Sequence, residues 1–396
     1  MTTSRDRLRV MYFCEGFTDI RFVVGLSGIT ELTFVTPARE YRISGLADRI
    51  AASGASVKVV EIPGGRPAFQ LRSFGYLLRN IAHYDVVLSQ EMVRGSLSAT
   101  IAGRLRGVPV VTYMGVAPLE YFMCRRERGQ IGIVKAWAGG AFIRSAMTVN
   151  GALATAALGM GPYLRDMAAR TSSCPLSGGY YGVDEQLFKP ACDPCRPTLR
   201  RSHQLPEDKF IIFFSSRISH EKDPETLLRA TAVVRDHGID AVLMNLGGGY
   251  EDFLKLALEL GLSDCEQWII GRPAVHPMHD LCEYFQLADV VVQSSLEEGF
   301  GLSPLEGLAC GTPVVATRVG GMAAHLDGYA QLTPRRDYQA MASAIQWVAE
   351  HRGAARAQAA KGREYVLANW TRAKVFNDLK TVLENAAATH PRRDRL

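Results

Sequence analysis

The chain has 396 residues, which is long for one doubly wound domain and suits two domains of roughly 150 to 200 residues each. Its apolar share of 47% and charged share of 21% exclude a disordered chain. Its net charge of +5 is mild. Apolar runs are too short for a transmembrane helix, and the polar, basic segment Met1 to Val10 lacks the apolar core of a signal peptide. We therefore expect a cytoplasmic protein.

In the first half, short β-branched and aromatic runs alternate with amphipathic stretches of helical length. This alternation is typical of repeated βαβ units and a parallel sheet. The predicted strands are Leu8–Phe13, Glu31–Val35, Val57–Ile62, Asp85–Ser89 and Val108–Tyr113. The predicted helices lie near Asp19–Ser27, Ser44–Ser53, Pro67–Ala82 and Ser96–Arg106.

The stretch from Cys174 to about Asp208 is dense in Pro, Gly, Ser and Cys, and it is interpreted as a linker. A second alternating series follows it. Its predicted strands are Phe210–Ser215, Ala241–Leu246, Gln267–Ile270, Asp289–Gln293 and Pro313–Ala316, and its predicted helices are Pro224–Asp236, Glu251–Leu260, Pro277–Leu287 and Pro304–Ala309. Helices from Tyr338 onward close the chain. The predicted fold class is thus α/β, with two Rossmann-like doubly wound domains and the ligand crevices beyond the carboxyl ends of the strands.

Two further patterns bear on partners. The eight cysteines are scattered, so free thiols are favoured over disulfides, and the close pair Cys192 and Cys195 lacks further ligands at zinc-site spacing. Basic and aromatic residues interleave between Tyr121 and Arg144, and more arginines stand in the C-terminal tail, namely Arg392, Arg393 and Arg395. This arrangement suits an anionic membrane surface, although a helix with one solvated basic face explains it equally well.

The stretch Ser294 to Ala316 carries the strongest chemical signal. It follows a predicted strand, turns through Gly299 and Gly301, and enters a helix near Ser303. Glycines let the backbone approach a ligand closely, and the amide groups of Phe300, Leu302 and their neighbours would point from the start of a helix toward an anion. The turn can therefore hold a phosphate.

Glu298 and Glu306 flank this turn, and both carboxylates can face one crevice, where they would accept hydrogen bonds from sugar or ribose hydroxyls. Each also has an ordinary explanation. Ser303, Pro304 and Glu306 form a capping-box pattern, in which Glu306 bonds only the backbone of its own helix. Glu298 could equally be a solvated loop carboxylate.

The sequence from Glu298 to Glu306, followed by Ala309-Cys-Gly-Thr-Pro-Val-Val-Ala316, resembles the E-x(7)-E signature of family 4 retaining glycosyltransferases, also called group 1 glycosyltransferases. Three further segments resemble motifs of that family: Gly182-Val-Asp-Glu-Gln-Leu-Phe-Lys-Pro190, Ser215-Ser-Arg-Ile-Ser-His-Glu-Lys222 and Leu246-Gly-Gly-Gly-Tyr250. The four motifs follow in order across roughly residues 180 to 325. The resemblance implies the GT-B fold, in which two such domains face each other across a cleft.

The resemblance also implies roles for single residues. Arg217 and Lys222 would neutralise the diphosphate of the donor as the glycosidic bond breaks, so that no divalent metal or other cofactor is needed. Glu298 would hold hydroxyls of the donor sugar, and Glu306 would bind the ribose. The backbone at Gly299, Phe300, Gly301, Leu302, Gly248 and Gly249 would contact the nucleotide sugar. Gly16 would approach the phosphates from the first domain.

The first half fits the family less closely. Cys14-Glu-Gly-Phe-Thr-Asp19 keeps one glycine of the pair that the family often has, and Tyr113 or Met114 stands where a histidine is frequent. Asp19 or Glu15 would orient or deprotonate the attacking hydroxyl, against the alternative that Asp19 only caps the first helix and Glu15 is a solvated loop residue. His220 would assist Arg217.

Together these expectations describe a metal-independent, retaining glycosyltransferase of the hexosyl type. Residues 1–190 would bind the acceptor, residues 191–370 the nucleotide sugar, and helix 371–396 would pack back on the first domain. The acceptor would be a saccharide or a lipid-linked molecule in bacterial polysaccharide, glycolipid or lipopolysaccharide biosynthesis, with the protein peripheral to the inner face of the plasma membrane and no nucleic acid as partner. The competing hypotheses are a sugar-nucleotide epimerase or phosphorylase of the same fold, and a non-catalytic nucleotide-sugar-binding subunit. The donor base and sugar, the linkage and the oligomeric state are left open.

Overall fold

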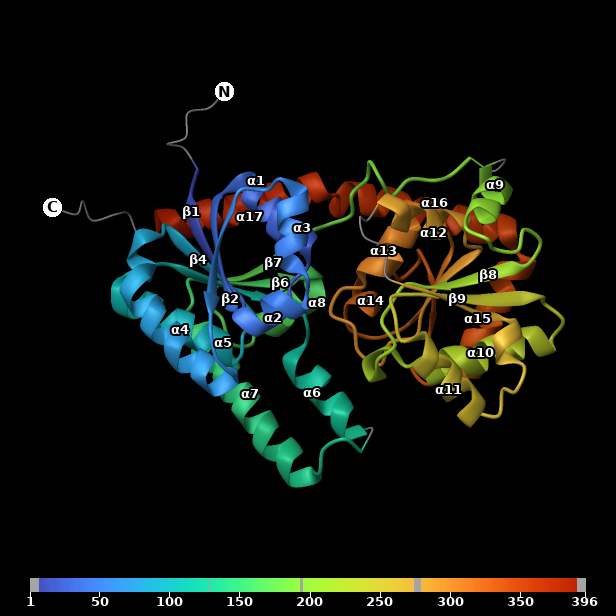
Figure 1. Ribbon diagram of the computed structural model, residues 1–396, viewed down its shortest axis with the longest axis horizontal. Coiled ribbons are helices and arrows are strands. Elements are labelled where there is room, and N and C mark those ends of the chain that lie inside the picture. The colour runs from blue at the N-terminus through green and yellow to red at the C-terminus, as the bar shows by residue number, and fades with distance from the viewer. Residues whose placement is uncertain (1–6, 128, 193–194, 274–278, 390–396) are drawn as a thin grey trace. The chain divides into compact units, whose positions relative to one another are not determined.

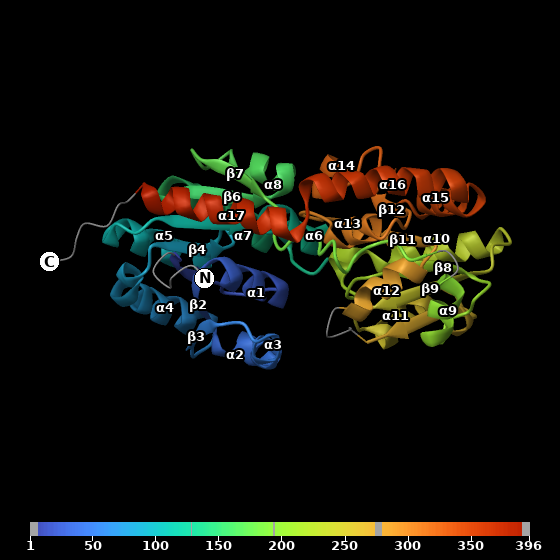
Figure 2. The ribbon, with the colours of Figure 1, turned by 90° about the horizontal axis from the view of Figure 1, so that it is seen from above.

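The computed structural model describes residues 7–127, 129–192, 195–273 and 279–389. The chain divides into two compact units. The first comprises Met1–Arg126, Ile131–Gly182 and Ala373–Leu396, and the second comprises Glu127–Gln130 and Val183–Arg372. Each unit consists of one parallel sheet covered by helices (Figures 1 and 2).

The sheet of the first unit has seven parallel strands in the order β3-β2-β1-β4-β5-β6-β7. The central strands are almost fully apolar and buried because helices cover both faces of the sheet. The strands are β1 (Arg9–Phe13), β2 (Glu31–Pro37), β3 (Val57–Ile62), β4 (Val86–Gln90), β5 (Val110–Met114), β6 (Ala156–Met160) and β7 (Pro175–Gly178).

The helices of the first unit include the last helix of the chain. They are α1 (Ile20–Ile29), α2 (Ala38–Ile43), α3 (Leu46–Ser53), α4 (Arg66–Asn80), α5 (Arg94–Arg106), α6 (Pro118–Glu127), α7 (Ile133–Leu153), α8 (Gly161–Ala168) and α17 (Arg372–Ala388). Helix α17 packs on α1 through the ring of Phe376, which fills the space above Gly25. A Cβ atom at Gly25 would lie 2.0 Å from Cζ of that ring. Glycine at this position therefore permits the close approach of the two helices.

The sheet of the second unit has six parallel strands in the order β10-β9-β8-β11-β12-β13. The strands are β8 (Phe210–Phe214), β9 (Ala241–Leu246), β10 (Ile269–Arg272), β11 (Val290–Gln293), β12 (Val314–Thr317) and β13 (Gln331–Thr333). The helices are α9 (Cys195–Ser202), α10 (Pro224–Asp236), α11 (Tyr250–Glu259), α12 (His279–Leu287), α13 (Leu302–Ala309), α14 (Gly320–His325), α15 (Tyr338–Glu350) and α16 (Arg352–Asn369). Phe210, Phe214, Phe253 and Trp268 are among the large side chains of its core.

The two sheets share one topology. In each, the strand order runs outward in one direction from the first strand and then reverses, between β1 and β4 in the first unit and between β8 and β11 in the second. Sheets of this type bind ligands outside the carboxyl ends of the strands at that point of reversal. The fold therefore marks one candidate site in each unit before any side chain is considered.

Two interpretations of the linker region are wrong. The segment Cys174 to Asp208 contains β7, which pairs with β6, and helix α9. Its high content of Pro, Gly and Ser reflects a short edge strand, which tolerates residues that a central strand excludes. Cys192 and Cys195 form a disulfide, with Cα atoms 5.3 Å apart, where the sequence favoured two thiols.

Some sequence features lie outside the described residues: Arg128, the tail arginines Arg392, Arg393 and Arg395, and the start of the helix predicted from Pro277. Across the described ranges no helix is long and apolar enough to cross a membrane. The same residues contain no group of three or more His, Cys, Asp or Glu side chains that could hold a metal ion.

Candidate active site

The central feature of the second unit is an ion pair at its point of strand reversal. Lys222 follows β8 and Glu298 follows β11, and Lys222 Nζ lies 2.5 Å from Glu298 Oε2. About one fifth of each side chain is exposed. The structure thus joins two residues that are far apart in the sequence and that were both predicted as site residues.

Two hydrogen bonds to backbone carbonyls hold the two loops together beside this pair. The hydroxyl of Ser294 donates to the carbonyl of Lys222 at 2.7 Å, and the amide of Leu296 donates to the carbonyl of Glu221 at 2.8 Å. The loop after β11 is therefore fixed to the 3₁₀ turn His220–Lys222 by groups on either side of the ion pair. The positions of the ammonium and the carboxylate are set by the fold as well as by their attraction.

The ammonium of Lys222 stays charged in this setting. Burial by itself lowers the pKa of Lys222, but the charge of Glu298 and its hydrogen bond, with smaller contributions from Glu221 and Glu297, outweigh burial and raise the pKa above its ordinary value. A permanently charged lysine at the carboxyl edge of the sheet can neutralise an anionic ligand such as a diphosphate.

A glycine turn connects Glu298 to helix α13. Gly301 is the N-cap residue, with φ of +87°, a backbone conformation that favours glycine. Gly321, at the start of α14, donates its amide to the carbonyl of Glu298 at 2.9 Å, and a Cβ atom at Gly321 would lie 2.1 Å from the carbonyl oxygen of Gly299. The turn through Gly299, Phe300 and Gly301 is therefore held against α14, and no side chain caps the start of α13.

The capping-box interpretation of this segment is wrong. Helix α13 begins at Leu302, so Ser303 and Pro304 stand inside the helix and Glu306 lies one turn further on. The hydroxyl of Ser303 is buried and makes no hydrogen bond within the described structure. Glu306 is buried, with 4% of its surface exposed. The first amides of α13 remain available to an anion, as at other helix starts that bind phosphate.

A second glycine turn follows β9. Gly247, Gly248 and Gly249 have φ of +141°, +87° and +81°. A Cβ atom at Gly247 would lie 3.0 Å from the carbonyl oxygen of Ser216, so this turn runs close to the loop after β8. Three glycines in succession leave a wall of bare backbone at the carboxyl edge of the sheet, where a flat ligand can approach.

Arg217 lies apart from the ion pair. Its side chain is 75% exposed, and Nη2 lies 3.6 Å from Glu221 Oε1. Glu221 is only 16% exposed, so it ties Arg217 to the same turn that carries Lys222. His220 belongs to this turn as well. The exposed guanidinium is free to move to a ligand, whereas Lys222 is already in place.

The aromatic support of the glycine turn comes from residues that the sequence did not indicate. The ring of Phe300 packs at right angles against His325, with centroids 4.8 Å apart, and against Trp370, with centroids 4.9 Å apart. Burial lowers the pKa of His325 to about 4, so this imidazole is neutral near pH 7. The signal for this packing lies only in the fold, because His325 and Trp370 stand outside the motifs.

In the first unit, Asp19 makes the contacts of a helix cap. It is the N-cap residue of α1, its Oδ1 accepts the amide of Arg21 at 2.8 Å, and its Oδ2 lies 3.0 Å from Arg21 Nη2. Tyr180 accepts the amide of Asp19 through its hydroxyl at 3.1 Å. This geometry matches the alternative that the sequence gave, namely a cap, and both carboxylate oxygens of Asp19 contact Arg21.

Glu15 is not the solvated loop residue that the alternative described. Only 11% of its side chain is exposed, and its Oε1 accepts a hydrogen bond from Arg94 Nε at 2.8 Å. Gly16 follows it at the carboxyl end of β1, and a Cβ atom there would lie 3.9 Å from Glu91 Oε1. The point of strand reversal in the first unit therefore holds two carboxylates, Glu15 and Glu91, near one glycine.

Glu91 is the residue that sequence reasoning missed. It follows β4 directly and has φ of +71°, a strained conformation for a residue other than glycine. Tyr180, which follows β7, and Asp223, which precedes α10, also have positive φ. Residues with strained backbone conformations are often found at functional sites. The sequence carried one indication of Glu91: it stands directly after β4, the strand that pairs with β1.

Tyr113, one of the two residues at the place where the family frequently has a histidine, is buried. Only 1% of Tyr113 is exposed, its ring stacks on Phe22 and Tyr180, and its hydroxyl has no hydrogen-bond partner in the described part of the chain. Burial raises the pKa of Tyr113 well above its ordinary value. Tyr113 cannot serve as a base near neutral pH and instead packs against Tyr180, whose hydroxyl accepts the amide of Asp19.

Comparison with known proteins agrees with this architecture. Among solved structures, Anabaena HepE in complex with UDP superposes with a TM-score of 0.76 over 96% of this chain and 100% of that chain, at 16% identity. Sucrose-phosphate synthase from Thermosynechococcus elongatus gives 0.73, with 97% and 100% coverage and 18% identity. WaaG, a glycosyltransferase involved in lipopolysaccharide biosynthesis, gives 0.68, with 97% and 100% coverage and 12% identity. The two doubly wound domains thus have the predicted GT-B fold.

Sequence comparison gives the family. Residues 196–365 match the glycosyl transferases of group 1, so the chain carries a group 1 glycosyltransferase domain and the predicted family is confirmed. A D-inositol 3-phosphate glycosyltransferase of Saccharomonospora viridis is 37% identical over 42% of this chain and 40% of its own length. The protein of that name from Arthrobacter is 32% identical over 60% of this chain and 55% of its own length. The chain thus spans about half the length of these relatives.

Proposed function

We propose that this chain is a glycosyltransferase that moves a sugar from a nucleotide-diphosphate sugar to an acceptor hydroxyl. The observation that carries the proposal is the Lys222–Glu298 pair at the point of strand reversal, beside the uncapped start of α13. A cation, a row of helix amides and a carboxylate at one edge are what a diphosphate and a sugar require together. The group 1 glycosyltransferase domain supports the same reaction class.

Each group has a distinct role in this proposal. Lys222, joined by the mobile side chain of Arg217, stabilises the negative charge that develops on the leaving diphosphate. The amides at the start of α13 hold the same phosphates. Glu306 accepts hydrogen bonds from the ribose, and Glu298 binds hydroxyls of the donor sugar. Lys222 reaches the diphosphate by sharing or leaving its contact with Glu298.

UDP sugars are the first donors to test, because the similar protein HepE has been crystallised in complex with UDP and with UDP-glucose. A thermal-shift screen of the full chain across UDP-, GDP-, ADP- and dTDP-sugars identifies the base, since a ligand that binds the folded state raises the melting temperature by mass action. We expect one base to give a clear shift. No shift with any of them at millimolar concentration would sink the proposal.

Activity assays on the parent and on two variants distinguish a transferase from an epimerase and from a protein that only binds the nucleotide sugar. We expect Glu298→Ala to abolish transfer and donor hydrolysis while nucleotide binding survives. Lys255→Ala, on the exposed face of α11, serves as the control with unchanged activity. Conversion of the donor to an epimer without any acceptor would identify an epimerase. Unaltered donor in the presence of every acceptor, despite tight nucleotide binding, would identify a non-catalytic subunit.

Retention and metal independence belong to the proposal as well. Proton NMR of the first product formed from an α-linked donor reports the anomeric configuration directly, and we expect the α-anomer. Activity should persist in excess EDTA, because Lys222 and the helix amides supply the positive potential that a metal would otherwise provide. A β-linked product would contradict retention. Activity that EDTA abolishes and Mg²⁺ restores would contradict metal independence.

The acceptor is proposed to be a saccharide or a lipid-linked molecule used to build bacterial polysaccharide, glycolipid or lipopolysaccharide, handled on the cytoplasmic side of the membrane. D-inositol 3-phosphate should be among the acceptors tested, because the similar proteins are named D-inositol 3-phosphate glycosyltransferases. Glu15 and Glu91 are candidates to orient the attacking hydroxyl, alongside Asp19. Glu91→Gln and Glu15→Gln should lower the rate of transfer more than they weaken donor binding.

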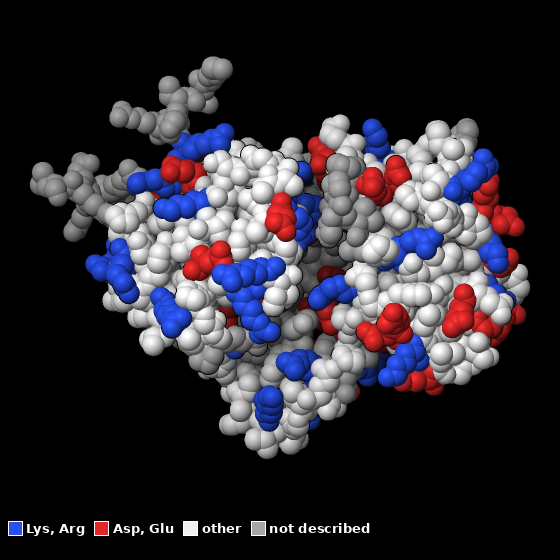
Figure 3. Space-filling view, viewed as in Figure 1, with Lys and Arg blue, Asp and Glu red and all other residues white. Residues whose placement is uncertain are grey.

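A membrane contact is proposed for α6 and α7. Apolar side chains of α7 are strongly exposed, including Val134 at 76% and Trp137 at 73%, and Tyr121 of α6 is 42% exposed. Lys135 and Arg144 share this region, and Figure 3 shows the end of these helices as a mainly uncharged surface with basic side chains among it. An apolar face beside cations suits the interface of an anionic bilayer.

Sedimentation with vesicles measures this contact. We expect the full chain to bind vesicles containing anionic phosphatidylglycerol and to lose most of that binding in Trp137→Ser. Leu258→Ser, a 52% exposed apolar residue on α11 of the second unit, is the matched control and should bind like the parent. Equal sedimentation of parent and Trp137→Ser would refute the contact.

A further inference from the structure

The disulfide between Cys192 and Cys195 differs from the other cysteines of the chain. Its two residues are three positions apart in the sequence, and both are exposed. The remaining six cysteines are free, and five of them are buried. A single bridge across so short a separation is not the framework of several disulfides that stabilises a small secreted domain. The pair therefore calls for a different explanation.

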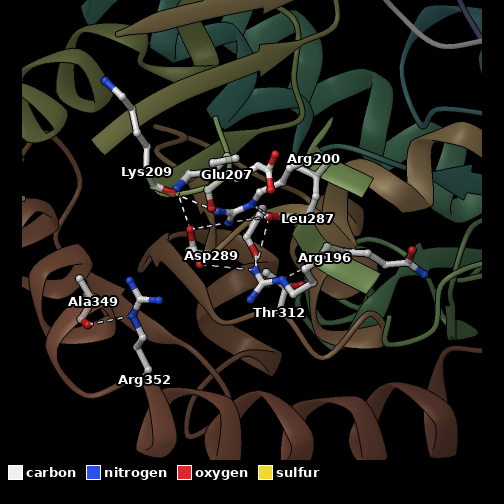
Figure 4. Close-up of polar contacts among 12 residues, drawn as sticks. Arg196, Arg200, Glu207, Lys209, Leu287, Asp289, Thr312, Ala349 and Arg352 are labelled. Carbon is white, nitrogen blue, oxygen red and sulfur yellow. Dashed lines mark hydrogen bonds and ion pairs between the residues drawn. The ribbon is translucent and has the colours of Figure 1, made fainter. Parts of the chain in front are cut away.

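The chain on both sides of the disulfide is anchored by other contacts. Arg200, in the second turn of α9, is 6% exposed and donates from Nε and Nη2 to the carbonyl of Leu287 at 3.0 and 2.8 Å. Its Nη2 also lies 2.7 Å from Asp289 Oδ2 (Figure 4). Before the disulfide, the carbonyl of Lys189 accepts a hydrogen bond from Gln286 Nε2 at 2.6 Å. Opening the disulfide leaves these contacts in place, so the fold does not depend on it.

The two sulfur atoms of the disulfide have different surroundings. Cys195 is the first residue of α9, and its amide donates to the carbonyl of Cys192 at 2.9 Å. The first turn of α9 has no acidic residue. The start of a helix favours a negative charge, so it stabilises a thiolate at Cys195 more than one at Cys192, which precedes the helix. Because a stabilised thiolate is the better leaving group, an attacking thiolate should bond to Cys192 and release Cys195.

We propose that Cys192 and Cys195 form a reversible thiol–disulfide exchange site whose partner is a dithiol. One thiolate of the dithiol attacks Sγ of Cys192, the bond between the two protein sulfurs breaks, and Cys195 leaves as a thiolate. The second sulfur of the dithiol then attacks the first, which breaks the mixed disulfide and releases Cys192. The dithiol is oxidised to a disulfide, the protein gains two electrons, and the two protons of the dithiol end on the two protein thiols. Exposed disulfides are the ones that exchange readily.

Labelling of the folded full chain tests the reversibility of this site. The chain is purified without reductant, treated with dithiothreitol in the absence of denaturant, trapped with N-ethylmaleimide and analysed by peptide mass spectrometry. We expect the peptide that contains Cys192 and Cys195 to carry no label before reduction and two labels after it. Replacing dithiothreitol with glutathione disulfide should remove both labels again. The melting temperature should fall by only a few degrees on reduction, because a disulfide that closes a short loop stabilises little.

Single variants test the order of attack. Cys192→Ser leaves only the thiol of Cys195, and Cys195→Ser leaves only that of Cys192. We expect iodoacetamide at pH 7 to alkylate Cys195 at least threefold faster than Cys192, because the start of α9 favours the thiolate. Cys174, which is free and exposed in both variants, is the internal reference and should react at one rate in the two samples. Equal rates for the two remaining thiols, or a faster Cys192, would overturn the assigned order.

Three results with the parent chain would overturn the exchange site itself. Labels that appear only when guanidinium chloride is added with dithiothreitol would show a structural bridge that exchange does not reach. Loss of the circular dichroism signal on reduction would show that the fold requires the disulfide. Two labels that persist after treatment with glutathione disulfide would show that the bridge does not form again. These measurements need no substitution, so they decide the proposal even if a serine variant does not fold.

Discussion

Breaking the Lys222–Glu298 pair gives the most informative perturbation of the site. Replacing Glu298 with Gln keeps the shape and one hydrogen-bond acceptor but leaves the ammonium of Lys222 without its partner, 2.5 Å away and only one fifth exposed. A partly buried ion pair of this kind contributes about 1–3 kcal/mol, less than a fully buried one because water still reaches it. In a unit of this size about 2 kcal/mol corresponds to a melting temperature lower by roughly 4–8 °C.

A double-mutant cycle isolates this interaction. Lys222→Met and Glu298→Gln are made singly and together, and the melting of the unliganded full chain is followed by calorimetry, which can resolve separate transitions for the two units. We expect the double variant to be less destabilised than the sum of the two single variants by about 1–3 kcal/mol. Strict additivity would refute the assignment of the pair as a coupled unit.

The two single variants should affect nucleotide binding differently, although both should lower stability. In Glu298→Gln the ammonium no longer has to leave a carboxylate, so the dissociation constant for the matching nucleoside diphosphate should stay the same or fall. In Lys222→Met it should rise by about ten- to a hundredfold, since a charge-assisted hydrogen bond to phosphate is lost. If both variants weaken nucleotide binding equally, Glu298 is only a support for the lysine and not a sugar-binding residue.

Three further predictions concern the surroundings of the sites. The folded chain keeps the pKa of His325 at about 4, below its ordinary 6.5, so the unfolded chain takes up a proton first as the pH falls. The free energy of unfolding, measured by denaturant titration, should therefore drop by about 3 kcal/mol from pH 6.5 to pH 4. The same dependence of this free energy on pH in His325→Asn would contradict this. Gly321→Ala places a Cβ atom 2.1 Å from the carbonyl oxygen of Gly299 and should weaken nucleotide binding at least tenfold by calorimetric titration, whereas Gly28→Ala, with nothing within 4 Å, should bind normally. Glu91→Gly relieves a φ of +71° and should raise the melting temperature of the first unit by a few degrees while slowing transfer; a less stable, fully active variant would show that Glu91 is neither strained nor functional.

Much of the fold was predictable because buried parallel strands leave a clear mark in the sequence. Ala241–Leu246 has the bounds that were predicted, since this fully buried run ends at the glycines that follow it. Strand β7 was missed because an edge strand of four residues, Pro175–Gly178, carries no such run. Helix α13 starts before the predicted Pro304 because Gly301 adopts a conformation with positive φ, which local patterns of Ser, Pro and Glu do not reveal.

In the candidate site, too, some residues could be predicted from the sequence and others could not. Lys222 and Glu298 could be named because each stands in a motif, and the fold then brings them into contact. Glu91 has no motif, and only the pairing of β4 with β1 places it beside Gly16. Sequence patterns identify residues within one element, whereas neighbours across elements require the sheet order.

The central claim is that the carboxyl edge of the second sheet binds a nucleoside diphosphate between the start of α13 and Lys222. A crystal structure of the full chain with the nucleotide selected by the thermal-shift screen tests it most directly. The account predicts a diphosphate against the amides of Phe300 to Ser303 within hydrogen-bond distance of Lys222, with the ribose on Glu306. A nucleotide bound elsewhere, with the Lys222–Glu298 contact intact and the start of α13 empty, would contradict it.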